Sequence, residues 1–135
     1  MDEKLPKLIR LRRLRVSILD RERNLLNKKL GHKVEEMERL KENVERFSFI
    51  YRTYSDDLAT KDAPLKSCKL GIQVMSAYRD MLLEKIRLNE TNIQHVIEEE
   101  NILMSEINDV DEAIISVRKS EKKIEFLIEI NNKND

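Results

Sequence analysis

Hydrophobic residues recur at heptad spacing through two long stretches of this chain, and this repeat constrains the fold more than any other feature of the sequence. The first stretch spans about 5–58, where one series of positions starts at Leu5 and the other at Ile9. Both series are apolar with few exceptions, which are Arg12, Arg23 and Lys33. Two apolar series that keep one register over this length are the d and a positions of a coiled-coil helix.

The second stretch repeats the pattern over about 72–130, and its polar exceptions are Arg79, Asn89, Glu100 and Glu121. The segment between the two stretches, about 59–71, contains Pro64 and Gly71, which favour a chain reversal. The whole chain has only two glycines and two prolines, and this leaves too few turn-forming residues for a sheet fold. We therefore predict an all-α fold in which the single domain 1–135 is a long two-helix antiparallel coiled-coil hairpin.

The charged exceptions predict how the two helices pair, because a charge on the seam needs an opposite charge across from it. If facing residues have numbers that sum to 133, Arg12 lies opposite Glu121 and Lys33 lies opposite Glu100. The same sum places the reversal inside the segment already assigned to it. It also sets the acidic stretch 88–117, which has no internal Lys or Arg, against basic residues of the first helix. The sequence thus predicts two hairpin register pairs.

The sequence contains no pattern typical of an active site or a metal centre. His32 and His95 face different residues in the predicted register, and the lone Cys68 has no histidine nearby to act as a base. The two isolated glycines form no phosphate-binding loop, and a pair of helices offers no concave pocket. We therefore predict a protein that is not an enzyme and that uses no cofactor and no metal.

Hydropathy and cysteine content favour a cytoplasmic protein. No apolar run approaches the roughly 20 residues of a membrane span, and no secretory signal follows Met1. A single cysteine fits a reducing compartment. The 26 basic residues balance 26 acidic ones, so the chain as a whole is not attracted to nucleic acid. Binding to a membrane surface requires a free apolar face, and we expect the hairpin to use that face itself.

The stretch LIRLRRLR, residues 8–15, concentrates positive charge near the N-terminus. In an antiparallel hairpin it adjoins a second basic stretch, 118–123. The end of the hairpin that bears both termini therefore carries ten cations, which are Lys4, Lys7, Arg10, Arg12, Arg13, Arg15, Arg118, Lys119, Lys122 and Lys123. This end is suited to an acidic or carbonyl-lined partner surface, and the alternative is a solvated helix end.

The architecture and size of the chain, with the stretches LIRLRRLRVSILDRERNLL (8–26) and SAYRDMLLEKIRLNE (76–90), resemble the FliJ/YscO (SctO) family. Members of this family are the central-stalk proteins of type III secretion and flagellar export. The likeness covers essentially the whole chain and favours an injectisome member, and hence a role in virulence. It implies a cytoplasmic, non-catalytic stalk, peripheral to the inner-membrane export apparatus, that enters a hexameric ATPase and stimulates it or couples it to the export gate.

The resemblance also implies two sets of contact residues. The end with the termini would bind the ATPase through Lys7, Arg10, Arg13, Arg15, Arg118, Lys119 and Lys122. The opposite end would contact the export gate or secretion chaperones through Asp56, Leu65, Met75 and Tyr78. Two rival interpretations stay open. One is a coiled-coil secretion chaperone or escort that holds a helical client against Tyr78, Met81 and Leu83, and the other is a structural tether that dimerises into a four-helix bundle.

Overall fold

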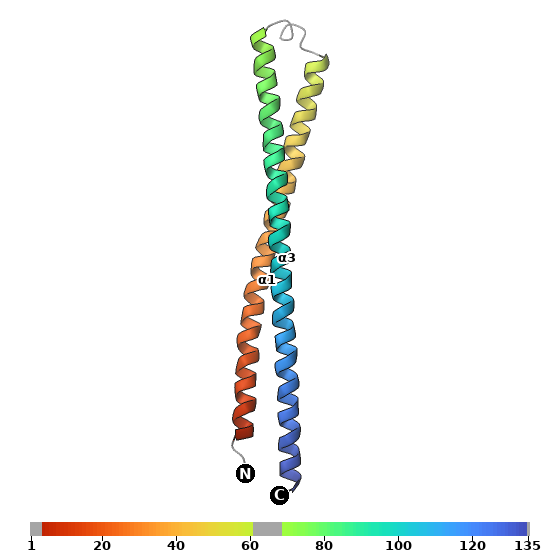
Figure 1. Ribbon diagram of the computed structural model, residues 1–135. Coiled ribbons are helices and arrows are strands. Elements are labelled where there is room, and N and C mark those ends of the chain that lie inside the picture. Colours follow the sequence, from red (N-terminus) through yellow and green to blue (C-terminus); the bar gives the residue numbers. More distant parts are fainter. Residues whose placement is uncertain (1–3, 61–68, 135) are drawn as a thin grey trace. The chain divides into compact units, whose positions relative to one another are not determined.

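The computed structural model describes residues 4–60 and 69–134, and each of these residues is helical. Helix α1 runs over Lys4–Thr60 and helix α3 over Lys69–Asn134 (Figure 1). Because the described chain contains two long helices and no strand, the predicted all-α helical hairpin is confirmed. Both helices extend a few residues beyond their predicted ends. The greater part of the predicted turn, 61–68, lies outside the described residues.

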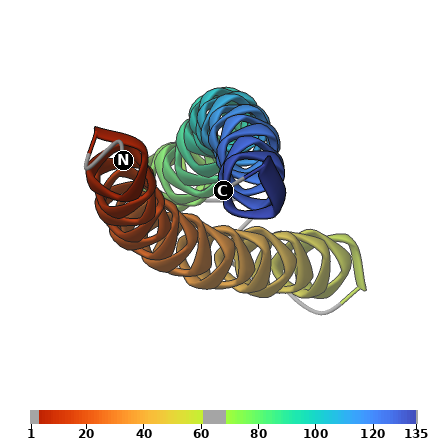
Figure 2. The same ribbon diagram turned by 90° about the horizontal axis from the view of Figure 1, so that it is seen from below.

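The chain divides into two compact units, each of which contains a stretch of both helices. We call them the terminal unit, with described residues 4–32 and 100–134, and the inner unit, with described residues 33–60 and 69–99. Both ends of the described chain belong to the terminal unit, where the first turns of α1 lie beside the last turns of α3 (Figures 1 and 2).

Aliphatic side chains form the core of the terminal unit. Leu19 and Leu26 of α1 are buried against Val110 and Ile114 of α3. Partly buried neighbours surround this cluster, and they are Val16, Leu103, Ile107, Ala113 and Val117. Each fully buried Leu or Ile side chain contributes about 1.5–3 kcal/mol by leaving water, so this cluster is the main stabilising contact of the unit.

Aromatic side chains join the helices of the inner unit over residues 47–54 of α1 and 78–85 of α3. Met37, Leu82 and Val96 are its buried hydrophobic residues. Beyond them, the half-buried Tyr54 packs edge-on against Tyr78 of α3, with ring centroids 4.6 Å apart and an interplanar angle of 65°. Edge-to-face pairs of this kind are favourable because the positive ring edge meets the negative ring face.

Two basic side chains of α3 extend this aromatic contact. The Arg79 guanidinium donates a hydrogen bond to the Tyr51 hydroxyl (3.3 Å) and lies 5.8 Å from the centre of that ring. This hydrogen bond lowers the pKa of Tyr51. Lys85 lies 5.2 Å from the centre of the Phe47 ring. Cation–ring contacts thus connect the two helices of the inner unit. The helices of the terminal unit are connected by aliphatic packing instead.

Heptad position predicts burial well along most of the described chain. All of its buried hydrophobic residues occupy a or d positions of the predicted seam, and they are Ile9, Leu19, Leu26, Met37, Leu82, Val96, Val110, Ile114 and Ile124. The first turns of α3 depart from this pattern. Ile72 is 48 % exposed and Arg79 is exposed, although both are a positions. In this region α3 presents Tyr78, one residue before Arg79, to the opposite helix.

The contacts of Arg12 and Arg13 define the register in the terminal unit. Arg12 Nε donates to Ser120 Oγ (2.7 Å), and Arg13 Nε donates to Glu121 Oε1 (2.8 Å). The residue numbers sum to 132 in the first pair and to 134 in the second, so each sum differs by one from the predicted 133. Glu121 therefore meets Arg13 rather than its predicted partner Arg12. The half-buried guanidinium of Arg12 is directed to one side of the seam, whereas the exposed Arg13 reaches the acid from the other.

Lys33 also binds an acid next to its predicted partner. Its ammonium group forms ion pairs with Glu36 on its own helix (3.4 Å) and with Glu99 of α3. The hydrogen bond to Glu99 raises the pKa of Lys33. The predicted partner, Glu100, is half-buried in the terminal unit. Lys33 thus pairs with an acid of α3, but the acid is Glu99, one residue before the predicted Glu100.

Candidate partner-binding surface

The predicted ATPase-binding residues are exposed on the last turns of the terminal unit. We call the residues 4–18 and 116–134 the terminal end. The exposed cations there that the sequence singled out are Lys7, Arg10, Arg13, Arg15, Arg118, Lys119 and Lys122. The helical repeat, however, distributes these cations over different sides of the helix pair.

One side of the terminal end contains an open groove of about 400 Å³ between the two helices. It is lined by Leu11, Arg12, Arg15, Ser116, Val117 and Ser120. Alternating steps of three and four residues extend this side along both helices. We call the resulting set the groove side, and it consists of Lys4, Leu8, Leu11, Arg15, Ile18, Ser116, Ser120, Lys123, Leu127 and Ile130.

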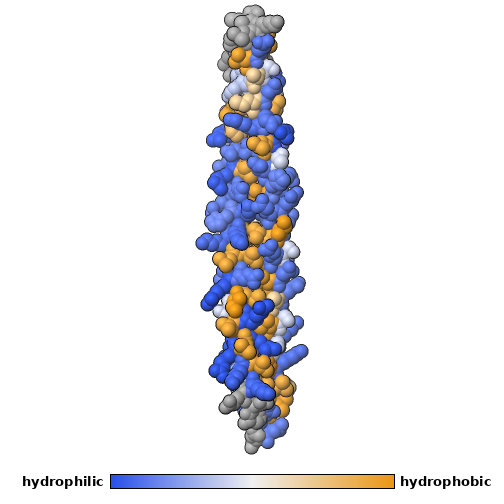
Figure 3. Space-filling view, turned by 60° about the vertical axis from the view of Figure 1, so that its left-hand side comes forward, coloured by the Kyte–Doolittle hydropathy of each residue, from blue (hydrophilic) through white to orange (hydrophobic). Residues whose placement is uncertain are grey.

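The groove side combines exposed hydrophobic residues with positive charge. Leu11 is 59 % exposed, Ile18 and Leu127 are each 48 % exposed, and Ile130 is 37 % exposed. A space-filling view shows hydrophobic side chains at the surface of the half that bears the termini, bordered by hydrophilic ones (Figure 3). The cations of this side are Lys4, Arg15 and Lys123. Within 4–18 and 116–134, the groove side carries no acidic residue.

The opposite side of the terminal end carries cations and acids together. We call it the ion-paired side, and it consists of Arg10, Arg13, Ser17, Arg118, Lys122, Glu125 and Glu129. Arg13 is its centre, since its guanidinium bonds Glu121 at 2.8 Å and Glu125 at 3.5 Å. The hydrogen bond to Glu121 is the main cause of a raised pKa at Arg13. Of the predicted ATPase-binding cations, Arg13 is therefore the one whose charge acids of α3 offset.

The sequence reasoning missed the exposed apolar residues of the groove side. It assumed that the hairpin uses the apolar face of the helices, and on that ground it argued against binding to a membrane surface. Leu11, Ile18 and Leu127, however, lie outside the a and d positions and are exposed. The signal was present in the sequence, where Leu8, Leu11, Arg15 and Ile18 follow each other at helical spacing beside the seam.

The residues predicted for the export gate or chaperones belong to the inner unit. Asp56 is exposed, Met75 is half-buried, and Tyr78 is 37 % exposed while it packs against Tyr54. Leu65 lies outside the described residues. Tyr78 also belongs to an exposed stripe on α3 that includes Val74, Met81 and Leu88, so the inner unit offers a second apolar surface.

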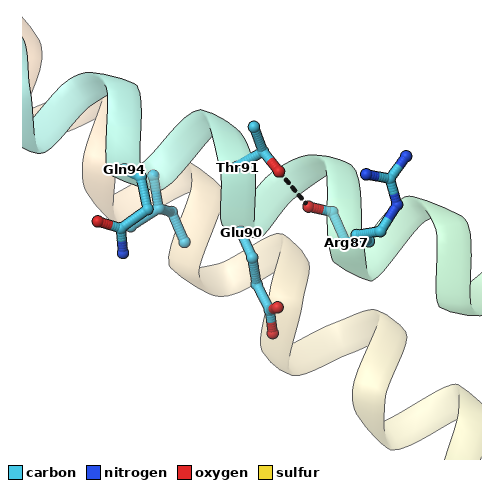
Figure 4. Close-up of a pocket in the computed structure, with 5 residues that line it drawn as sticks. Arg87, Glu90, Thr91 and Gln94 are labelled. Carbon is cyan, nitrogen blue, oxygen red and sulfur yellow. Dashed lines mark hydrogen bonds between the residues drawn. The ribbon is translucent and has the colours of Figure 1, made fainter.

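The inner unit also has a shallow depression on one face of α3. It is lined by Arg87, Glu90, Thr91, Ile93 and Gln94 (Figure 4). Thr91 Oγ1 donates to the backbone carbonyl of Arg87 (3.0 Å), so its hydroxyl bonds its own helix. The side-chain amide of Asn89 likewise donates to the carbonyl of Lys85 (2.7 Å). These polar groups bond within α3, and the depression presents no converging set of reactive groups.

No group of three or more His, Cys, Asp or Glu side chains is placed to hold a metal ion within the residues described. Neither α1 nor α3, over the same residues, has a window apolar enough to span a membrane. Comparison with protein-family models, with curated proteins and with solved structures finds no match to this chain.

Proposed function

We propose that this protein is a non-catalytic central stalk of a type III secretion export apparatus, of the FliJ/YscO kind. Its terminal end enters a hexameric export ATPase and stimulates it or couples it to the export gate. The observation that carries the proposal is the density of exposed cations on the terminal end, with Lys7, Arg10, Arg15, Lys119 and Lys122 among them. Acids that line a ring attract such an end at long range and orient it before contact.

A stalk of this kind holds its partner mainly by charge. Exposed charge pairs each contribute roughly 0–1 kcal/mol and weaken with salt, so several together retain a helix pair in a ring without deep interlocking. The core cluster of the terminal unit packs both helices against each other, which suits a stalk that enters its partner as a helix pair. In this proposal the protein acts in the cytoplasm, at the inner-membrane export apparatus.

The test is ATP turnover of a type III export ATPase with and without this protein. The variant carries Arg10→Glu, Arg13→Glu and Arg15→Glu. Its matched control carries Arg39→Glu, Lys41→Glu and Arg52→Glu, which change the same charge at exposed positions of α1 in the inner unit. We expect the wild type and the control to stimulate ATP turnover. The terminal variant should bind the ATPase at least about tenfold more weakly, which the concentration dependence of the stimulation measures. Equal stimulation by both variants contradicts the proposal.

A second candidate, an escort for a helical secretion client, is favoured by the exposed stripe on α3. Val74, Tyr78, Met81 and Leu88 follow each other at steps of four, three and seven residues, and each is exposed. This is the spacing with which one helix presents an apolar stripe to another. An escort would bind an amphipathic client through this stripe and would ignore the ATPase. A Met81→Glu variant should then lose the client, and neither the wild type nor this variant should stimulate the ATPase.

A further inference from the structure

The terminal end is unequal on its two sides, and this inequality is more informative than its total charge. The groove side has three cations, four exposed hydrophobic residues and no acid within 4–18 and 116–134. The ion-paired side has four cations, but Glu125 and Glu129 accompany them. A partner that needed only positive charge would find it on both sides. A partner that needs apolar contact as well finds exposed hydrophobic residues among the groove-side set and none among the ion-paired set.

We propose that the groove side binds an acidic amphipathic helix, whose apolar stripe enters the groove and whose flanking carboxylates meet Lys4, Arg15 and Lys123. This inference deepens the proposed function and rests on it, since it names the chemistry of the surface that the terminal end meets. The groove side extends over residues 4–18 of α1, which is roughly 20 Å of helix. A partner helix of about four turns covers that length.

The shape of the groove favours a helix over other occupants. Its floor contains the half-buried Arg12, Val117 and Ser120, and its banks contain the exposed Leu11, Arg15 and Ser116. A third helix packs into the depression between two others at roughly 8–10 Å from each axis, so the small residues Ser116 and Ser120 permit close approach. A flat bilayer surface touches only the banks. It would leave the floor, where Arg12 bonds Ser120, uncovered.

The experiment measures binding of a fluorescent synthetic helix to the full chain by anisotropy. The probe has about 18 residues, with Leu at steps of three and four and Glu on both flanks, and its control is the same composition in scrambled order. We expect salt-sensitive binding of the amphipathic probe alone. Arg15→Glu with Lys123→Glu should lower its affinity at least about tenfold, because Arg15 lines the groove and Lys123 lies on the same side of the helix pair.

The matched control changes the same charge at exposed positions of α1 in the inner unit, with Arg39→Glu and Arg52→Glu. We expect this pair to change affinity by less than about threefold, because long-range attraction alone is affected. A Leu11→Ser and Ile18→Ser variant, which leaves the charge unchanged, should weaken binding as strongly as the groove-side charge reversal. Circular dichroism of each variant establishes that helix content is retained.

Three results would overturn the inference. The first is an equal loss of affinity in the two charge-reversed pairs. The second is concentration-dependent self-association, seen by light scattering, that is lost in the Arg15 and Lys123 variant and identifies a second copy as the occupant. The third is tighter binding to phosphatidylglycerol vesicles than to the probe. The ATPase assay remains a separate readout. Loss of stimulation with normal probe binding contradicts the proposed function alone, and stimulation without probe binding contradicts this inference alone.

Discussion

The terminal unit and the inner unit use the same two helices but join them with different side chains. In the terminal unit, buried Leu, Val and Ile form one cluster, and Arg13 and Arg23 pair with acids of α3 at its edges. In the inner unit, few aliphatic residues are buried, and aromatic rings meet each other or a cation. The same heptad pattern thus describes both units. Aliphatic burial stabilises the terminal unit, whereas contacts of aromatic rings with each other and with cations stabilise the inner unit.

The largest expected difference between the units lies in what one seam residue contributes. Ile114 and Ile72 are both a positions, but Ile114 is 3 % exposed in the terminal core and Ile72 is 48 % exposed. Ile114→Ala should lower the free energy of unfolding by about 2–5 kcal/mol, through lost burial and the cavity that remains. Ile72→Ala should lower it by about 0.5 kcal/mol or less. Urea unfolding followed by circular dichroism measures both, and similar losses would contradict this comparison.

Most of the fold could be predicted from the sequence, because it depends on a period that survives single exceptions. A seam of Leu, Ile and Val positions fixes which face of each helix is buried, whatever Arg12, Arg23 or Lys33 do individually. The exact partner of a seam cation could not be predicted. Long side chains reach acids one residue to either side, as the contacts of Arg23 with Asp111 and of Lys33 with Glu99 illustrate.

The candidate site could be predicted in part. Clustered cations at both ends of the chain, together with an antiparallel fold, are enough to predict a basic terminal end. The inequality of its two sides depends on which cations face acids of the other helix, and that follows only from the side-chain contacts of Arg13. The role of Tyr78 was also beyond the heptad pattern, because Tyr78 occupies a position outside the a and d series yet packs on Tyr54.

A smaller effect should show that ring contact stabilises the inner unit. Tyr54→Leu and Tyr78→Leu, singly and together, form a double-mutant cycle on the edge-to-face pair. We expect a coupling of about 0.5–1.5 kcal/mol, because each single change already removes the interaction between the two rings. The matched control pairs Tyr78→Leu with Phe49→Leu, since Phe49 is 64 % exposed on α1. That control should be additive, and coupling of the same size in both cycles would remove the distinction drawn for this unit.

The smallest expected effect concerns the ion pairs at the edge of the terminal core. Arg23 Nη1 lies 3.2 Å from Asp111 Oδ1, and both side chains are about 40 % exposed. A double-mutant cycle with Arg23→Gln and Asp111→Asn should give a coupling of roughly 0.2–1 kcal/mol that shrinks as salt is added. The control cycle combines Arg21→Gln with Asp111→Asn and should show no coupling, because residues two apart lie on different faces of a helix. A coupling that exceeds that of Tyr54 with Tyr78, or that resists salt, would show that charge rather than aliphatic burial distinguishes the terminal unit.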